Sequence, residues 1–367
     1  MVKLRASAKR PQFQPVDLQK VPHVDALLEE LNVGPFDPST VSAALGRNNN
    51  WSGTTRGGER VFVKQLLDGE SDERIRRTES AWRACDGRLS TPRLIGSDPE
   101  HALLVFAHVP DARSGVELLG DEEFDEDLCA RAGRALAVLH GLDVEELDTS
   151  PHPLPPLPLL EALSLDYYRR ASAAELSMWR LLQADLPLIE ALGALRAADT
   201  EEVPSRCAIH GDLRLDQFLL SGDELHLTDF EEFRAGDPAR DIGAFAGEWL
   251  FHAVVGIPAK LAESSSFGHV ATHEEIIATG AAEIEQRAPY VRAFFSAYLE
   301  DAPGRVHDDK GLAARAAAYA GWHMLDRMLA AAGNAAHLSA VNKAAAGIGR
   351  TVLLSPADFT SSLGLEA

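Results

Sequence analysis

The first third of the chain combines helix-like and strand-like patterns of apolar residues. Residues 21–33 place apolar side chains at helical spacing and end at a Gly-Pro pair, which predicts a helix. Residues 41–67 form short strand-like runs separated by turn residues, including two adjacent glycines, and predict two or three antiparallel strands. A helix over 72–85 and a buried strand over 103–106 follow. We therefore expect an antiparallel sheet with one main helix, preceded by an extra helix.

The rest of the chain is dominated by patterns typical of helices. Residues 127–142 carry apolar side chains on one helical face and meet a glycine near the end, as expected for a core helix. Alanine-rich segments at 159–198 and 311–350 also predict helices, whereas the proline cluster at 151–160 predicts a stiff connector. No period of about 20 to 50 residues repeats, which argues against a solenoid.

The balance of charge changes between these two regions. Residues 46–93 contain ten basic and seven acidic side chains, a net charge of +3, whereas residues 116–148 contain two basic and eleven acidic side chains, a net charge of −9. Together with the change of pattern, this predicts a boundary near residues 108–112. We expect an α+β chain made of an N-terminal extension with a helix (1–40), a small lobe (41–108) and a large, mostly helical lobe (109–367).

Length and composition narrow the class of protein. A chain of 367 residues and 39.6 kDa is longer than one compact core usually holds, which favours two lobes. Its formal net charge of −21 argues against DNA or RNA as a partner, because phosphate backbones are bound by Lys and Arg. The apolar runs are too short to span a bilayer, so we expect no membrane partner. Three widely spaced cysteines predict no disulfide framework and indicate a cytoplasmic protein.

Residues 207–243 carry the clearest chemical signal. Short strand-like runs leave Asp212 and Asp229 at strand ends on either side of a hairpin, so we expect the two carboxylates to converge on one small space. A carboxylate beside an acceptor hydroxyl can orient it and take its proton, and a second carboxylate can hold a magnesium ion that bridges nucleotide phosphates. Phosphoryl transfer requires both functions.

Two segments in this region resemble a known family. HGDLRLDQ resembles the HGDxxxxN loop of the aminoglycoside phosphotransferase and choline kinase superfamily, and TDFEEFRAGDPARDIG resembles its IDFE and GDPxxDL segments. The resemblance implies a bilobal, protein-kinase-like fold and a kinase that uses ATP and Mg²⁺ to phosphorylate an alcohol. It implies that Asp212 is the catalytic carboxylate and Asp229 the main magnesium ligand, assisted by Glu231. Gln217 stands where the family has asparagine; it keeps the amide oxygen, adds a methylene, and is expected as the second metal contact.

The resemblance extends to scaffold and nucleotide-binding residues. It implies that His210 supports the catalytic loop and that Asp241 closes it. Lys64 ends a strand-like run and is expected to reach the nucleotide phosphates, as the family's strand-three lysine does. Glu79, in the next predicted helix, is expected as the ion-pair partner of Lys64, with Glu73 as the alternative.

Further nucleotide contacts are expected on the same basis. The loop GRNNNWSG lacks a GxGxxG pattern, and Ser52 and Gly53 are the contacts predicted from it. The segment 106–109 is expected to form the hinge beside the adenine, with Phe106 and His108 as its contacts.

The acceptor is suggested by resemblance alone. The segments GRNNNWSGTTRGGERVFVKQL, HGDLRLDQFLL and DFEEFRAGDPARD are similar to those of the stand-alone kinases of class V lanthipeptide and thioviridamide-like biosynthesis. This similarity implies phosphorylation of Ser or Thr in a ribosomally made precursor peptide, with a lyase as the implied partner. Two alternatives stay open: a kinase for an aminoglycoside or another small-molecule antibiotic, and a nucleotide-binding pseudokinase that partners a lyase. The presence of Lys64, Asp212 and Asp229 argues against the pseudokinase, whereas Gln217 leaves it open.

Overall fold

The computed structural model forms two compact units. It describes residues 13–15, 18–44, 48–67, 69–143, 147–200, 205–264, 271–333 and 335–366. The first unit comprises Met1–Phe124, Glu146–Asp148 and Leu215–Phe233, and the second comprises Asp125–Glu145, Thr149–Arg214 and Arg234–Ala367. A segment from late in the sequence therefore completes the first unit. Residues 1–12 of the expected N-terminal extension, and 45–47 of the expected nucleotide loop, lie outside the described residues.

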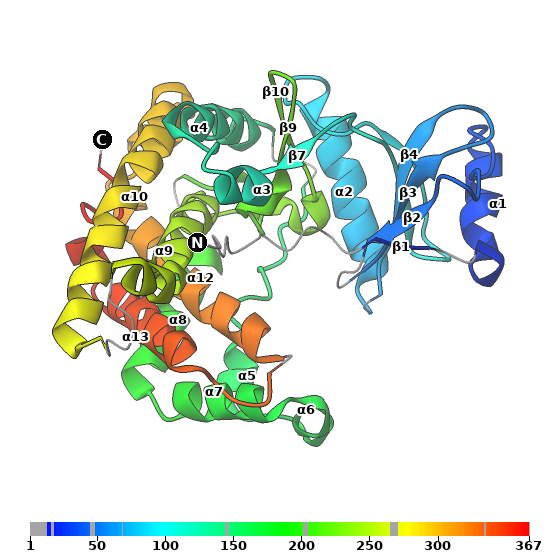
Figure 1. Ribbon diagram of the computed structural model, residues 1–367. Coiled ribbons are helices and arrows are strands. Elements are labelled where there is room, and N and C mark those ends of the chain that lie inside the picture. The colour runs from blue at the N-terminus through cyan, green and yellow to red at the C-terminus, as the bar shows by residue number, and fades with distance from the viewer. Residues whose placement is uncertain are drawn as a thin grey trace. The chain divides into compact units, whose positions relative to one another are not determined.

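A six-stranded sheet with the order β1-β2-β3-β4-β6-β5 forms the body of the first unit (Figure 1). Neighbouring strands all pair antiparallel, as the pattern of residues 41–67 predicts, but the sheet also gains β1 and β5 at its two edges, which the sequence does not indicate. The strands are β1 (Phe13–Pro15), β2 (Ser42–Ala44), β3 (Asn49–Thr54), β4 (Arg60–Gln65), β5 (Leu94–Asp98) and β6 (Leu103–Ala107).

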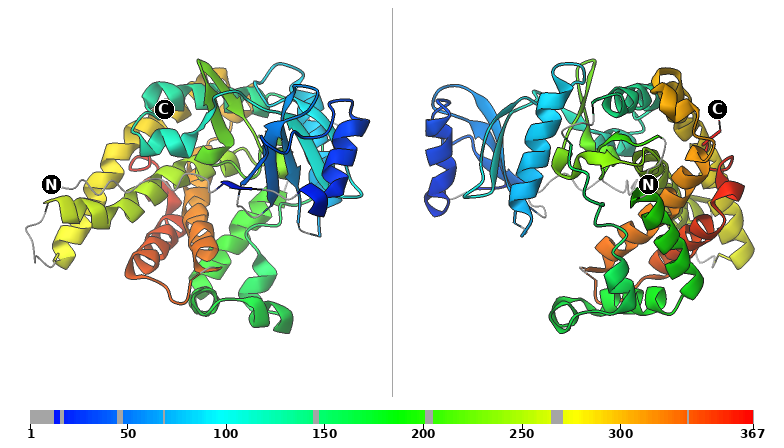
Figure 2. Two further views of the ribbon diagram at one scale, coloured as in Figure 1. Left: turned by 45° about the vertical axis from the view of Figure 1, so that its right-hand side comes forward. Right: turned by 180° about the vertical axis from the view of Figure 1, so that it is seen from behind.

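Two helices cover opposite sides of this sheet (Figures 1 and 2). Because side chains alternate along a strand, Val61 and Val63 of β4 share one face, and both are fully buried against α1 (Pro22–Glu30). The alternate residues of β4, including Lys64, belong to the other face. On that face, α2 (Ser71–Cys85) packs through a cluster formed by Leu66, Ile75 and Leu104. The period of two therefore places Lys64 on the side of the sheet that faces α2.

The first unit continues through a second, three-stranded sheet with the order β10-β9-β7. In β9 and β10, Phe218 pairs with Leu227 and Ser221 with Glu224, and Gly222 turns the hairpin with φ of 56°. The unit limits differ from the boundary expected near residue 108, because this hairpin and α3 belong to the first unit. The elements are β7 (Arg113–Ser114), α3 (Gly115–Gly120), η2 (Leu215–Gln217), β9 (Phe218–Ser221), β10 (Glu224–Leu227) and η3 (Phe230–Glu232).

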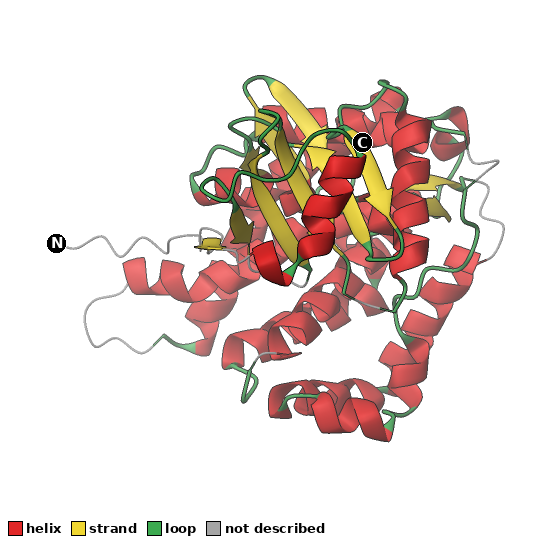
Figure 3. Cartoon of the chain, turned by 90° about the vertical axis from the view of Figure 1, so that its right-hand side faces the viewer, coloured by secondary structure: helices red, strands yellow, loops and turns green. Residues whose placement is uncertain are grey.

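The second unit is mostly helical, which confirms the predicted α+β class (Figure 3). One short pair of strands, β8 and β11, also belongs to this unit, and β8 leads directly into the loop that carries Asp212. The elements are α4 (Glu126–His140), α5 (Leu157–Glu161), α6 (Leu165–Arg170), α7 (Ala173–Gln183), α8 (Leu186–Thr200), β8 (Cys207–Ile209), β11 (Arg234–Gly236), α9 (Ala239–Ser264), α10 (His273–Asp301), α11 (Gly304–His307), α12 (Leu312–Gly333), α13 (Ala340–Leu354) and η4 (Pro356–Phe359).

Small residues let the long helices of this unit approach closely. A Cβ on Gly133 of α4 would lie 2.1 Å from the carbonyl oxygen of Phe294 in α10, and a Cβ on Gly243 of α9 would lie 2.3 Å from that of Ala316 in α12. Helix α9 is long and apolar enough to cross a membrane on length and composition alone, but 61% of its most apolar window is buried inside the protein. A core helix of a globular domain satisfies the same criteria.

The proline cluster fixes buried arginines. Arg234, which is 1% exposed, donates to the carbonyl oxygens of Ser150 and Pro151, and Arg240 donates to that of Leu154 at 2.9 Å. Proline residues lack an N–H group, so this segment offers acceptors to the guanidinium groups. The connector therefore also holds the side chains of Arg234 and Arg240 in place through its carbonyl oxygens.

Candidate active site

Lys64 is the centre of a charged group in the first unit. Its Nζ atom lies 2.5 Å from Oδ1 of Asp229 and also bonds Oε1 of Glu231. The lysine side chain is 13% exposed, so these carboxylates replace water around the ammonium group. Burial favours the neutral amine, but the two carboxylates outweigh it and raise the pKa of Lys64 above its usual value. The ammonium group is therefore charged and held in place at neutral pH.

The direction of the Asp229 side chain is set by a left-handed backbone conformation in the turn between β10 and η3. Its φ of 67° lies in the left-handed region, which aspartate tolerates better than most residues. The preceding residue, Thr228, donates to the carbonyl oxygen of Gln217 from its backbone nitrogen at 2.9 Å and from its hydroxyl at 3.1 Å. These bonds tie the backbone of Gln217 to the residue beside Asp229.

The oxygen-rich side chains of this turn suit a magnesium ion. Asp229 and Glu231 supply carboxylate oxygens, and Gln217 supplies an amide. The Gln217 Nε2 atom is buried without a hydrogen-bond partner, which leaves room for the amide to present its oxygen instead. Among the described residues no group of three His, Cys, Asp or Glu side chains has the arrangement of a metal site. Mg²⁺ commonly takes one or two carboxylates, with water and phosphate oxygens as its other ligands, so these residues fit it.

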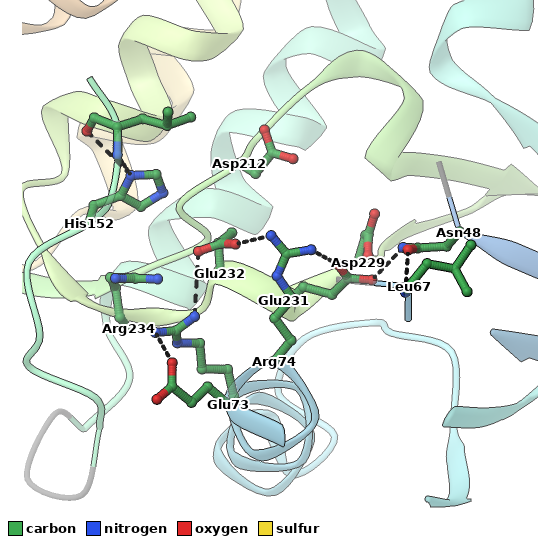
Figure 4. Close-up of polar contacts among 12 residues, drawn as sticks. Asn48, Leu67, Glu73, Arg74, His152, Asp212, Asp229, Glu231, Glu232 and Arg234 are labelled. Carbon is green, nitrogen blue, oxygen red and sulfur yellow. Dashed lines mark hydrogen bonds and ion pairs between the residues drawn. The ribbon is translucent and has the colours of Figure 1, made fainter. Parts of the chain in front are cut away.

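Glu231 joins Lys64 to helix α2. Its Oε1 atom also accepts from Asn48 Nδ2 at 3.4 Å, while its Oε2 atom faces Arg74 Nη1 at 3.4 Å (Figure 4). Burial, and then the charge of Asp229, raise the pKa of Glu231 to about 7, although Lys64 and Arg74 act in the opposite direction.

The expected ion pair between Lys64 and Glu79 does not form in this structure. Glu79 accepts a hydrogen bond from the Ser97 hydroxyl at 2.6 Å and lies 3.9 Å from Arg83. Five residues of helix separate Glu79 from Arg74, a rotation of about 140° around the axis, so the two side chains leave α2 on different faces. The alternative, Glu73, is 53% exposed and lies near Arg76 and Arg77. The part these glutamates play toward a nucleotide stays a prediction.

Of the four other predicted nucleotide contacts in the first unit, three lie on strands and His108 directly follows β6. Ser52 of β3 pairs with Phe62 and thus shares the face of Lys64, whereas a Cβ on Gly53 would meet Val41 at 3.0 Å. Phe106 packs against the cluster between the sheet and α2, and His108 donates from its backbone to Arg60 at 3.0 Å. Burial, and then the charge of Arg60, lower the pKa of His108. Their contacts with adenine or phosphate stay predictions.

The loop of the second unit that carries Asp212 is anchored by Asp241. This fully buried carboxylate accepts the backbone N–H groups of His210 at 2.6 Å and Gly211 at 2.9 Å, and it lies 3.1 Å from Nε2 of His140. Burial alone would raise its pKa, but the hydrogen bonds and the charge of His140 lower it. Gly211 has φ of 85°, a conformation that favours glycine. The end of β8, the turn at Gly211 and the hydrogen bonds to Asp241 together fix the backbone position from which the Asp212 side chain extends.

Asp212 presents an accessible carboxylate in the same unit. Its side chain is 47% exposed, and its Oδ2 atom accepts from Arg214 at 3.0 Å. A second carboxylate of this unit, Asp326 on α12, is electrostatically coupled to it: burial, opposed by His323 and reinforced by Asp212, raises the pKa of Asp326. Asp326 forms no hydrogen bond or ion pair with any other described residue.

The structure thus distributes the predicted catalytic residues over both units. It brings Lys64, Asp229 and Glu231 together in the first, and it anchors Asp212 in the second. Sequence reasoning missed the supporting charges. In the run RIRR, Arg74 and Arg77 stand three residues apart, a spacing that puts them on one helical face. The sequence does not show which acidic residues they contact. The missed residues are Asn48, Arg74, Arg77, Asp148, Arg214 and Asp326.

Comparisons with known proteins identify the family and the fold. The model of the phosphotransferase enzyme family, APH, matches residues 42–275. A solved amicoumacin kinase, hAmiN, in complex with AMP-PNP, Ca²⁺ and Ami, is 13% identical, with a TM-score of 0.58 over 93% of this chain and 94% of that chain. Its likeness supports the same fold.

Other solved structures are similar at lower scores. A choline/ethanolamine kinase family protein from Mesorhizobium loti is 16% identical, with a TM-score of 0.49 over 89% of this chain and 92% of that chain. Macrolide 2'-phosphotransferase MphH from Brachybacterium faecium is 15% identical, with a TM-score of 0.49 over 92% and 98%. No curated protein sequence matches the chain. The family match covers more than half of the residues, and the chain is a member of the phosphotransferase enzyme family, whose enzymes transfer phosphate to hydroxyl acceptors.

Proposed function

We propose that this enzyme transfers the γ-phosphoryl group of ATP to a hydroxyl of a small molecule that carries an amino group. The observation that carries the nucleotide part is the buried pairing of Lys64 with Asp229 in the first unit. A lysine ammonium suits phosphate oxygens, and the carboxylate beside it suits the accompanying metal ion. Asp229 would hold a bound Mg²⁺, with Glu231 and the Gln217 amide as further oxygen donors, and the ion would supply positive charge to offset the negative charge of the phosphates.

Asp212 is the residue we assign to the acceptor hydroxyl. Arg214 occupies its Oδ2 atom, and nearly half of the side chain is exposed, so Oδ1 is available to accept a hydrogen bond from the hydroxyl. That bond orients the oxygen for attack, and the carboxylate takes the proton as the bond to phosphorus forms. The anchoring of the loop by Asp241 keeps Asp212 in position for this step.

One observation supports a small-molecule acceptor, and a second supports an amino group on it. The solved relative with the TM-score of 0.58 is a kinase of amicoumacin, and it covers nearly all of this chain. Asp326 adds a partly buried carboxylate that is coupled to Asp212 and has no partner among the described residues. An ammonium group on the acceptor would compensate that charge.

The resemblance to lanthipeptide kinases supports a second acceptor class, a Ser/Thr-rich precursor peptide with a partner lyase. The family and the amicoumacin kinase support the small-molecule reading better, so the peptide is the alternative. The pseudokinase alternative predicts nucleotide binding without transfer. It is less favoured because Lys64, Asp229 and Asp212 are all present in ordered surroundings.

One experiment separates these readings. The purified chain is incubated with ATP and Mg²⁺ and with three kinds of acceptor: amino-bearing small molecules such as aminoglycosides, the N-acetylated forms of the same molecules, and a Ser/Thr-rich precursor peptide. Mass spectrometry then detects the gain of a phosphoryl group. The proposal expects phosphorylation of an amino-bearing molecule that falls on N-acetylation. Transfer to the peptide alone, or nucleotide binding with no transfer to any acceptor, would overturn it.

A further inference from the structure

We propose that Arg74 of α2 is a positioning residue that retains Glu231 when Lys64 turns to the nucleotide. The inference rests on the proposed function, because it assigns Lys64 to the nucleotide phosphates. The inference gives α2 a different role from the one that the sequence predicted, in which Glu79 of this helix pairs with Lys64. The structure shows an arginine of α2 in contact with a carboxylate that also holds Lys64.

The contacts form a continuous chain of charges within the first unit. Arg74 Nη1 lies 3.4 Å from Oε2 of Glu231, and Arg74 Nη2 lies 3.3 Å from Oε1 of Glu232. Arg77, one helical turn on, lies 3.6 Å from Oε2 of Glu232 and 2.8 Å from Oδ2 of Asp148. Both arginine side chains are nearly buried, at 12% and 8% exposed. Helix α2 therefore forms ion pairs with both Glu231 and Glu232 (Figure 4).

The two oxygens of Glu231 have different partners. Oε1 bonds Lys64, and Oε2 faces Arg74. The Glu231 side chain is only 11% exposed, so it cannot exchange a lost partner freely for water. If Lys64 moves its ammonium group to a phosphate, Arg74 still compensates the carboxylate. Without Arg74, departure of Lys64 would leave a buried carboxylate with no cation beside it, which is strongly unfavourable.

Arg74 should therefore determine how readily Lys64 becomes available. In an Arg74→Met variant, Glu231 retains Lys64 in competition with the nucleotide, and nucleotide binding weakens. This effect depends on the negative charge of Glu231, so binding is measured at a pH well above the Glu231 pKa of about 7. Replacing that charge by Glu231→Gln removes the competitor, so the effect of Arg74→Met should largely vanish in the Glu231→Gln background.

A double-mutant cycle tests this prediction. The dissociation constant of ATP is measured without metal, by calorimetry in the presence of EDTA, for wild type, Arg74→Met, Glu231→Gln and the double variant. We expect Arg74→Met to weaken binding about tenfold in the wild-type background and less than about twofold in the Glu231→Gln background. Arg74→Lys, which keeps the charge, should lie near wild type. Arg76→Met is the matched control on the same helix, because Arg76 is 71% exposed and should have no effect.

The outcomes separate this inference from the proposed function. Equal weakening by Arg74→Met in both backgrounds would show a general structural role and overturn the inference, as would no weakening at all. If Arg74→Met fails to fold, Arg74→Gln enters the same cycle with the same expectation. Failure of the wild type to bind ATP under any condition would instead contradict the proposed function itself.

Discussion

Nζ of Lys64 and Oδ1 of Asp229 lie 2.5 Å apart although 165 residues separate them in sequence. The first residue lies near the end of strand β4 of the large sheet, and the second follows a hairpin that belongs to the same unit. The pair therefore links the two segments in which phosphate-binding and metal-binding roles are expected. A buried lysine between two carboxylates is costly to assemble and needs excellent geometry, which favours a functional reason for keeping it.

Removal of the Lys64 charge should affect binding and stability together. In a Lys64→Met variant, Asp229 and Glu231 lose their shared cation and repel one another. We expect unfolding in urea to show a loss of about 1–3 kcal/mol, and the KM for MgATP to rise at least about tenfold. The exposed Lys260→Met is the matched control, because the Lys260 side chain is 49% exposed and pairs with the exposed Glu263. Unchanged affinity for MgATP would remove Lys64 from the site.

Acid stability should depend on Glu248. Burial would raise its pKa, but the hydrogen bond from His323 and the charges of His323 and Arg327 lower it to about 2, from 4.5. A lowered folded-state pKa stabilises the protein above pH 4.5, and this contribution is lost as the pH falls from about 4.5 to about 2. At neutral pH it is on the order of 3 kcal/mol.

The measurement is urea unfolding of wild type and Glu248→Gln between pH 3 and 7. We expect the difference in unfolding free energy between the two proteins to shrink as the pH falls through this window. A difference that stays constant with pH would show that the carboxylate charge of Glu248 is not what stabilises the fold.

Asp326 should select the acceptor. An Asp326→Asn variant loses the negative charge that compensates an acceptor ammonium group, while Asp212 remains to act on the hydroxyl. For an amino-bearing acceptor we expect KM to rise about tenfold and kcat to change less than about threefold. The KM for MgATP should stay near that of wild type.

Its control is Asp358→Asn, since Asp358 is an exposed aspartate of the same unit. An N-acetylated acceptor serves as the second control, because it carries no ammonium group for Asp326 to bind. Equal effects of Asp326→Asn on the amino-bearing and N-acetylated acceptors would contradict the assignment.

The sequence predicts several elements of the first unit, because each of these has a strong local signal, whereas it does not indicate β1, β5 or β7. The period of two in RVFVKQ defines β4 and the face that carries Lys64, and the helical period over 72–85 gives α2 within a residue or two. The motifs around Asp212 and Asp229 mark the candidate site through residue types at fixed spacing. These features are local, so a single sequence contains them.

The partners of those residues are not local. Glu79 and Arg74 belong to the same predicted helix, and only the rotation of α2 against the sheet decides which one turns toward Glu231. Likewise, the composition of the proline cluster indicates a connector, but not that its carbonyl oxygens hold Arg234 and Arg240. Ion pairs between distant segments follow from packing, which the local pattern does not specify.

The central claim is that Asp212 takes the proton of the acceptor hydroxyl while MgATP is bound to the enzyme. The most direct measurement compares Asp212→Asn with wild type in two assays: the affinity for MgATP, and the rate of phosphoryl transfer to an amino-bearing small molecule. The account predicts affinity within about threefold of wild type and transfer slowed by a factor of about 10² or more. Transfer by Asp212→Asn at the wild-type rate would contradict it.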